Sequence, residues 1–295
     1  MTTVTFQDLW SLIKSGDLKS LEKAYKPELF ESKEHGINLF HIACYENKDA
    51  NIIKFLVKKN PNLDLINIAD GTKTSTALYA VRNIQHNSKS IEALKWLLTN
   101  SWIDINVKDN LDNSALGESF ELEKPDAALL ILGIKGTVLV DTTHRGIPLI
   151  NCLLSSKNVA KILPAFLKRS PYINVVGPDG DHPLIIAVKK GLTNEVKLLL
   201  ALPNINVDAK DANGDTSLAL SSPVIADLLI KAGATVDTQN KDGNSPLHLA
   251  VAKNEIHKVT SLIKAKAKKD ITNNKGFTAK QIASSVNLTH LEKLL

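Results

Sequence analysis

The stretch Lys241–Leu262, KDGNSPLHLAVAKNEIHKVTSL, contains a complete structural unit. It opens with Asp242-Gly243, a pair of turn formers in which the glycine tolerates a positive φ without steric cost. Ser245 can then cap a helix, and Pro246 suits its start because proline presets φ and lacks an N–H that would find no helical partner there. An apolar helical face follows, Asn254 interrupts it, and a second amphipathic segment begins. The stretch predicts a turn followed by two short helices.

The same unit recurs along the chain. The leucine after the cap-like dipeptide returns at intervals of 29 to 38 residues, with Phe40 in its place in the first copy and Lys280 in the last. The leucines are Leu78, Leu116, Leu149, Leu184, Leu218 and Leu247. A period near 33 residues indicates an array of repeats rather than a single globular core.

Four short sequence motifs resemble those of a known family. They are GDHPLIIA at 180–187, GDTSLAL at 214–220, GNSPLHLA at 243–250 and GFTAKQIA at 276–283. These resemble the ankyrin repeat, whose pattern is a turn followed by T-P-L-H-x-A. The resemblance implies an all-α fold, an ankyrin-repeat solenoid of stacked helix-turn-helix units with projecting β-turn loops.

The repeat pattern also predicts how the chain is divided. Residues 1–35 are expected to form an N-terminal capping helix pair, 36–273 seven ankyrin-like repeats, and 274–295 a C-terminal capping repeat, all in one continuous solenoid domain. Pro125 and Pro223 are expected to start second helices. The polar segment Asn83–Ser90 is expected to form a protruding loop between two helices.

Composition narrows the functional classes. The chain has 295 residues, 43% of them hydrophobic and 5% aromatic, and a formal net charge of +5. Its two cysteines do not indicate a disulfide framework, and its N-terminal stretch lacks the basic and apolar regions of a secretory signal. Apolar runs stay well short of the ~20 residues of a spanning helix, so we expect a soluble, cytoplasmic protein.

The sequence contains few candidate catalytic or metal-binding residues. His41 and Cys44 lie three residues apart on a predicted helix, which could form a thiolate–imidazole pair. The resemblance instead assigns His41, like His248, a structural hydrogen-bonding role, and Cys44 fits a small buried residue. The other histidines lack the spacing of a zinc site. We expect no catalytic residue, no metal and no cofactor, with an unrecognised Cys/His enzyme as the rival hypothesis.

A lysine-rich segment near residue 264 has several interpretations. Lys264, Lys266, Lys268 and Lys269 cluster there, flanked by Lys253, Lys258 and Lys275. We interpret this cluster as a solvated face, since it has no interleaved aromatic residue or arginine and lysines suit a helix C-terminus. The alternatives are that the cluster binds an acidic protein partner, a nucleic acid or a membrane.

The resemblance also implies where a partner would bind. Ankyrin-type proteins usually bind partners on the concave surface made by turn tips and first helices. That pattern gives the following candidate residues: Tyr45, Glu46, Asn83, Asn113, Glu121, Asp179, Asp181, Lys189, Lys190, Asp215, Asp242, Asn244 and Lys253. Trp102, in a loop, is a further candidate as an exposed anchor. Trp96 is expected to lie in the core, and Trp10 is expected to belong to the N-terminal capping unit.

The predicted function is protein binding without catalysis. We expect a monomer with one protein partner, and no nucleic-acid or membrane binding. Many lysine, asparagine and isoleucine residues suggest an AT-rich genome. With the stand-alone repeats, this resembles the ankyrin effectors that intracellular bacteria deliver into the host cytosol or nucleus, where the partner would be a host protein. A eukaryotic-type cytoplasmic adaptor is the alternative setting.

Overall fold

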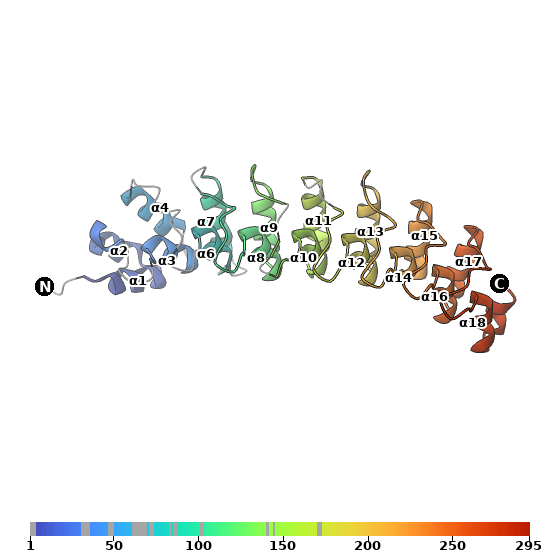
Figure 1. The fold of residues 1–295 in the computed structure, drawn as a ribbon. Coiled ribbons are helices and arrows are strands. Elements are labelled where there is room, and N and C mark those ends of the chain that lie inside the picture. The colour runs from blue at the N-terminus through green and yellow to red at the C-terminus, as the bar shows by residue number, and fades with distance from the viewer. Residues whose placement is uncertain are drawn as a thin grey trace. The chain divides into compact units, whose positions relative to one another are not determined.

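The computed structural model describes residues 4–30, 36–46, 50–60, 70, 74–82, 84, 88–100, 103–139, 142–143, 145–169 and 173–295. These fall into two compact units, Met1–Arg169 (unit 1) and Ser170–Leu295 (unit 2). Within each unit the helices come in pairs, as Figure 1 shows. The regular elements of the described residues are α-helices, with one short 3-10 turn and isolated bridges beside the turns.

Unit 1 is a stack of helix pairs. The first helices α1, α3, α6, α8 and α10 contact one another in that order, and so do the second helices α2, α4, α7, α9 and α11. Their bounds are α1 Phe6–Ser15, α2 Leu18–Ala24, η1 Pro27–Leu29, α3 Leu39–Glu46, α4 Ala50–Lys59, α6 Thr76–Arg82, α7 Ser88–Leu98, α8 Ala115–Glu121, α9 Pro125–Leu132, α10 Leu149–Ser155 and α11 Val159–Leu167.

Unit 2 repeats the arrangement. The first helices α12, α14, α16 and α18 stack in sequence, and the second helices α13, α15 and α17 pack beside them. Their bounds are α12 Pro183–Lys189, α13 Thr193–Leu200, α14 Ser217–Leu220, α15 Pro223–Lys231, α16 Pro246–Ala252, α17 Ile256–Lys264, α18 Ala279–Ser285 and α19 Thr289–Glu292. All-α stacked helix pairs were the predicted fold, and that prediction is confirmed.

The opening stretch folds as its residues predict. Ser245 is the N-cap of α16, and its hydroxyl and amide contact His248 Nδ1 at 2.8 and 3.2 Å, which forms a capping box. Pro246 begins the helix, and Asn254 has a φ of +56° after its end. The periodic leucines are buried, whereas Lys280 is exposed.

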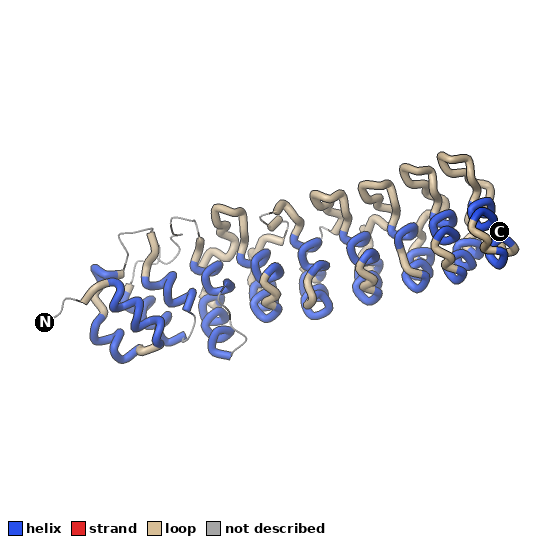
Figure 2. The backbone as a smooth tube through the Cα atoms, turned by 90° about the horizontal axis from the view of Figure 1, so that it is seen from below, coloured by secondary structure: helices blue, strands red, loops and turns tan. Residues whose placement is uncertain are grey.

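A hydrogen-bonded turn precedes most first helices. The residue that opens it donates its amide to the carbonyl four residues later, as Asp109, Asp211, Asn240 and Asn273 do. The side-chain oxygen of the same residue accepts amides two and four residues on, which fixes the turn as an Asx motif. Figure 2 shows these tan turns along one edge of the helices of unit 2.

Neighbouring turns in unit 2 also bond to each other. The amide of Lys241 donates to the carbonyl of Asn213, and the amide of Asn274 donates to the carbonyl of Asp242. Gly243 lies in this contact with a φ of +76°, and a Cβ there would lie 2.7 Å from the Asn274 amide nitrogen. The glycine is therefore required by close approach as well as by conformation.

Two sequence predictions about burial were wrong. Trp96, expected in the core, is half-buried in α7, and Lys54 lies 6.0 Å from its ring centroid. Lys258, counted with the solvated lysines, is 0% exposed. In both cases the local sequence marks a helix, but the facing helix decides which positions are covered.

Candidate protein-binding surface

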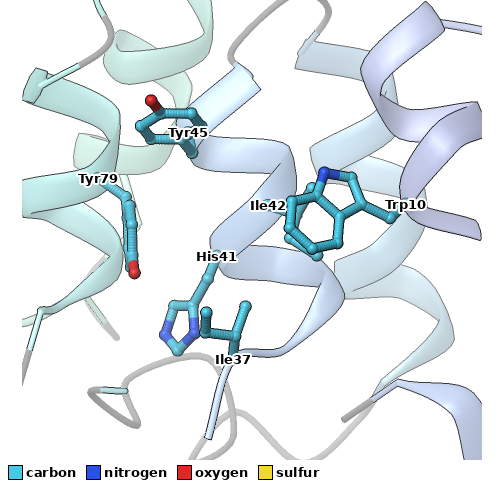
Figure 3. Close-up of a pocket in the computed structure, with 6 residues that line it drawn as sticks. All are labelled: Trp10, Ile37, His41, Ile42, Tyr45 and Tyr79. Carbon is cyan, nitrogen blue, oxygen red and sulfur yellow. The ribbon is translucent and has the colours of Figure 1, made fainter. Parts of the chain in front are cut away.

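Unit 1 contains an open pocket where α1, α3 and α6 meet. Its volume is about 160 Å³. Figure 3 shows Trp10 from α1 on one side of α3 and Tyr79 from α6 on the other. The lining residues are Trp10, Ile37, His41, Ile42, Tyr45 and Tyr79. The walls are mostly ring faces and aliphatic carbon, so the pocket suits an apolar group.

The aromatic side chains on one side of this pocket are packed against each other. The rings of Tyr45 and Tyr79 lie 6.0 Å apart at 88°, and those of His41 and Tyr79 lie 5.4 Å apart. Tyr79 donates its hydroxyl to the carboxylate of Asp70, and burial together with this bond raises the pKa of Tyr79 above its ordinary value. Tyr45 is 46% exposed, so it presents aromatic surface while its neighbours limit its movement.

His41 lines the pocket and Cys44 is buried on the same helix, and the surroundings of each indicate a structural role. His41 Nδ1 accepts the amide of Asn38 at 3.3 Å, and Asn38 Oδ1 accepts the amide of His41 at 2.9 Å. Cys44 is fully buried, and burial raises the pKa of its thiol well above the ordinary value. A buried, protonated thiol is a poor nucleophile. The structural role expected for both residues matches their surroundings.

The candidate residues of unit 1 differ in accessibility. Tyr45 and Glu121 are exposed, and Glu46 is half-buried. Asn113 is 7% exposed, because its amide groups bond to the carboxylate of Asp109 within the turn. The prediction of Asn113 as an exposed turn-tip residue was therefore wrong. Asn83 and Trp102 lie outside the described residues, as do 85–87 of the predicted Asn83–Ser90 loop, whose last three residues begin α7.

In unit 2 most candidate residues are accessible. Asp215 is the exception at 9% exposed; its carboxylate accepts the side-chain amide of Asn240 from the next turn, so its prediction as an exposed residue was wrong. Asp181 and Asn244 are half-buried. The exposed candidates are Asp179, Lys189, Lys190, Asp242 and Lys253.

Lys189 is exposed but engaged in the fold. Its Nζ lies 2.8 Å from Asp181 in its own turn and 3.1 Å from Asp211 in the next turn. Burial alone would raise the pKa of Asp211, but hydrogen bonds from its turn and from Lys189 bring it below the ordinary value. A substitution of Lys189 would therefore change the contact between turns as well as the surface charge.

A comparable ion pair in unit 1 had not been predicted. Arg82, at the end of α6, contacts Asp109 in the next turn, Glu118 on α8 at 3.1 Å and Thr74 at 3.2 Å. Burial alone would raise the pKa of Asp109, but the bonds from Asn113 and Arg82 lower it. One feature of the sequence could have predicted this pair. Asp109 and Asp211 each open a turn, and the first helix of the repeat before each turn ends in a cationic residue, Arg82 or Lys189.

The described ranges contain no group of three or more His, Cys, Asp or Glu side chains arranged to hold a metal ion. None of the helices within those ranges is both long enough and apolar enough to span a bilayer.

Comparison with known proteins identifies a repeat in part of the chain. A sequence model of the ankyrin repeat matches residues 179–212 and 242–274, which span the turn and helix pair of α12–α13 and of α16–α17. These two segments of the chain are therefore ankyrin repeats by sequence. The solved crystal structure of the ankyrin repeat protein EF0377 has the same fold, with a TM-score of 0.56 and 22% identity, over 60% of this chain and 94% of that one.

Proteins similar to this chain come from viruses and vertebrates. The ankyrin repeat protein OPG189 of Variola virus is 24% identical over 251 residues, which cover 81% of this chain and 42% of the viral protein. The putative palmitoyltransferase ZDHHC13 of Danio rerio is 38% identical over 87 residues, or 28% of this chain and 14% of that protein. The chain thus matches less than half the length of these relatives.

Proposed function

We propose that this ankyrin-repeat protein binds a partner protein without catalysing a reaction, and that the pocket of unit 1 receives one large apolar side chain of that partner. The pocket at the meeting of α1, α3 and α6 carries the proposal. Ankyrin repeats are generally protein-binding modules, and the first helices and turns form the surface from which we propose that binding occurs.

The size of the pocket favours an anchor side chain over a free small molecule. Small-molecule sites usually enclose about 300–1,000 Å³, whereas this pocket measures about 160 Å³. That volume suits a single leucine-sized or phenylalanine-sized group. Tyrosine and tryptophan also supply a large share of the binding energy in protein interfaces, and here both line one pocket.

We further propose that the exposed charges around the first helices determine which partner is selected. Glu46 follows Tyr45 directly, Glu121 ends α8, and unit 2 exposes Lys190 and Lys253 at equivalent helix ends. Charges at the rim of an interface contribute more to orientation and association rate than to affinity. We therefore assign affinity to the aromatic pocket and selectivity to these charged positions.

The test is selection of peptides from a random displayed library on the intact chain, followed by binding measurements with variants. Tyr45→Ala should weaken the selected peptides at least tenfold (about 1.4 kcal/mol), and their sequences should share one large apolar residue. Phe277→Ala is the matched control, because Phe277 in unit 2 has the same 46% exposure. Equal binding by wild type and Tyr45→Ala, with unchanged melting temperatures, would reject the pocket as the site.

The biological setting is a separate inference. Delivery of the protein from a bacterium into the host cytosol or nucleus, inferred from composition, stays a prediction. A cytoplasmic adaptor of eukaryotic type is the alternative. Pulldown from host-cell extract with wild type and Tyr45→Ala, compared by mass spectrometry, would identify proteins whose capture depends on the pocket.

A further inference from the structure

Lys258 is a fully buried lysine that joins two repeats of unit 2. It belongs to α17, yet its Nζ donates to main-chain carbonyls that follow or end α14, at 3.0 Å to Ala219 and 2.6 Å to Ser221. The side chain therefore leaves its own helix pair and ends in the preceding one. Burying an ammonium group is costly unless it finds such partners.

The target of this contact is an unusually short helix. α14 has four residues, whereas α12 and α16 have seven each. In α12 and α16, three successive amides after the helix fold back to its last carbonyls. The chain after α14 turns at once into α15, which begins at Pro223 and so lacks an amide hydrogen at its first residue. Ser221 Oγ donates to the Leu218 carbonyl at 2.9 Å, whereas the carbonyls of Ala219 and Ser221 take a donor from another repeat.

Neighbouring charges do not replace these carbonyls as the partners of Lys258. Glu255 Oε2 forms an ion pair with Nζ at 3.6 Å, which is longer than either carbonyl contact, and this oxygen has no hydrogen-bond partner. Burial lowers the pKa of Lys258 to about 8, and the nearby Lys253 acts in the same direction while Glu255 opposes it. The amine can donate to both carbonyls in its charged and its neutral form.

The position of Lys258 is buried in the neighbouring repeats too. The third residue of α13 is Glu195 and that of α15 is Ile225, and both are buried. Unit 1 shows a related contact, in which Lys124 Nζ donates at 2.7 Å to the carbonyl of Ile84, just after α6. In both places a lysine from one repeat donates to a main-chain carbonyl at or just after the end of the preceding first helix.

We propose that Lys258 replaces the missing turn of α14 and thereby couples the repeat of α14–α15 to the repeat of α16–α17. Repeat proteins depend on intrinsic repeat stability plus contacts between neighbours. A one-turn first helix offers little packing surface of its own. The lysine contact supplies the coupling that a longer helix would otherwise provide, and the two repeats open together.

Hydrogen exchange of the intact protein tests this proposal. In Lys258→Met, which keeps the apolar stem but loses the donors, amides of residues 216–222 should exchange about tenfold faster or more, as the loss of buried hydrogen bonds predicts. Amides of α12 should exchange at the wild-type rate. Lys264→Met is the matched control, since Lys264 ends the same helix and is exposed. Unchanged exchange at 216–222 in Lys258→Met would overturn the proposal.

A second measurement uses only the wild-type protein, so it tests the proposal even if Lys258→Met does not fold. In the wild-type protein, acylation of individual lysines by acetic anhydride is followed by mass spectrometry over a series of urea concentrations. Acylation of Lys258 should rise in step with amide exchange at 216–222, because both require the same opening. Acylation of Lys258 as rapid as that of Lys264 without urea would show that the contact is absent in solution.

Discussion

At the scale of single residues, the same residue type serves opposite purposes within one repeat. Lys253 is exposed at the end of α16, whereas Lys258, five residues on, is buried against the end of α14. His41 and His248 each use Nδ1 to accept the amide of their N-cap region. Position within the repeat, rather than residue type, decides the role of a polar side chain here.

His248 predicts a pH dependence of stability. Its Nδ1 accepts the Ser245 amide and its Nε2 lies 3.0 Å from the Phe277 carbonyl oxygen, so the neutral ring with a proton on Nε2 fits both bonds. Burial lowers the pKa of His248. The unfolded chain therefore binds a proton near pH ~6.5 before the folded chain does, and stability should fall as pH drops below that value.

The measurement is urea unfolding between pH 7.5 and 5. Wild type should lose more stability on acidification than His248→Gln, which cannot titrate, although the variant should be less stable by about 1–3 kcal/mol at neutral pH. His290→Gln is the control, because His290 is exposed and bonds only to Asn254 among the contacts described. Parallel pH profiles for wild type and His248→Gln would contradict the prediction.

At the scale of elements, the turns of unit 2 are as much part of the stack as the helices. The turns before α14, α16 and α18 open with an Asx motif, and the turns containing Asn213, Asp242 and Asn274 are joined by backbone hydrogen bonds. The helices bury leucines between neighbours, while the turns align the neighbours along one edge. The helix packing and the turn contacts both recur because the sequence motifs that produce them recur.

Alanine substitutions at two glycines allow the cost of backbone strain to be measured separately from the cost of a steric clash. Gly243 and Gly276 have φ values of +76° and +78°, so alanine is strained at both. A Cβ at Gly276 would meet nothing within 4 Å, whereas at Gly243 it would lie 2.5 Å from the Asn274 side chain and 2.7 Å from its amide nitrogen. Gly243→Ala should therefore cost on the order of 1–3 kcal/mol more than Gly276→Ala. Equal shifts of the urea midpoint would show that the turns do not approach so closely.

At the scale of the whole molecule, two compact units are each built from contacts between successive helix pairs. Such an arrangement has no single core, so a local defect should remain local. The pocket of unit 1 follows from the same principle, because three consecutive first helices each contribute one wall. Function, as proposed, depends on neighbouring repeats rather than on any one of them.

A core substitution tests this local behaviour. Leu247→Ala removes a fully buried side chain from α16 and should destabilise its surroundings by about 2–5 kcal/mol. Hydrogen exchange should accelerate in α14 to α18 and stay unchanged in α1 to α4. The exposed Leu111→Ala serves as control. Acceleration throughout both units would mean that the molecule unfolds as one cooperative body.

The sequence predicted the repeat and the ends of many helices, because these depend on local signals. Pro125, Pro223 and Pro246 begin helices as expected, and the leucines that define the period are buried. The candidate surface was predicted less well. Asn113 and Asp215 are buried by bonds within and between turns, and Tyr79 was not singled out although it lines the pocket. The predicted division at residues 35 and 273 stays a prediction.

The sequence by itself determined the turn, the paired helices and the register in which they recur, since capping, φ preference and apolar period act within about one turn of a residue. Only the tertiary structure decided that Lys258 is buried, that Arg82 joins Asp109 and Glu118, and that aromatic rings from α1, α3 and α6 meet in one pocket. These facts depend on the side chain that the neighbouring repeat brings opposite, some 30 residues away. No local pattern carries that information.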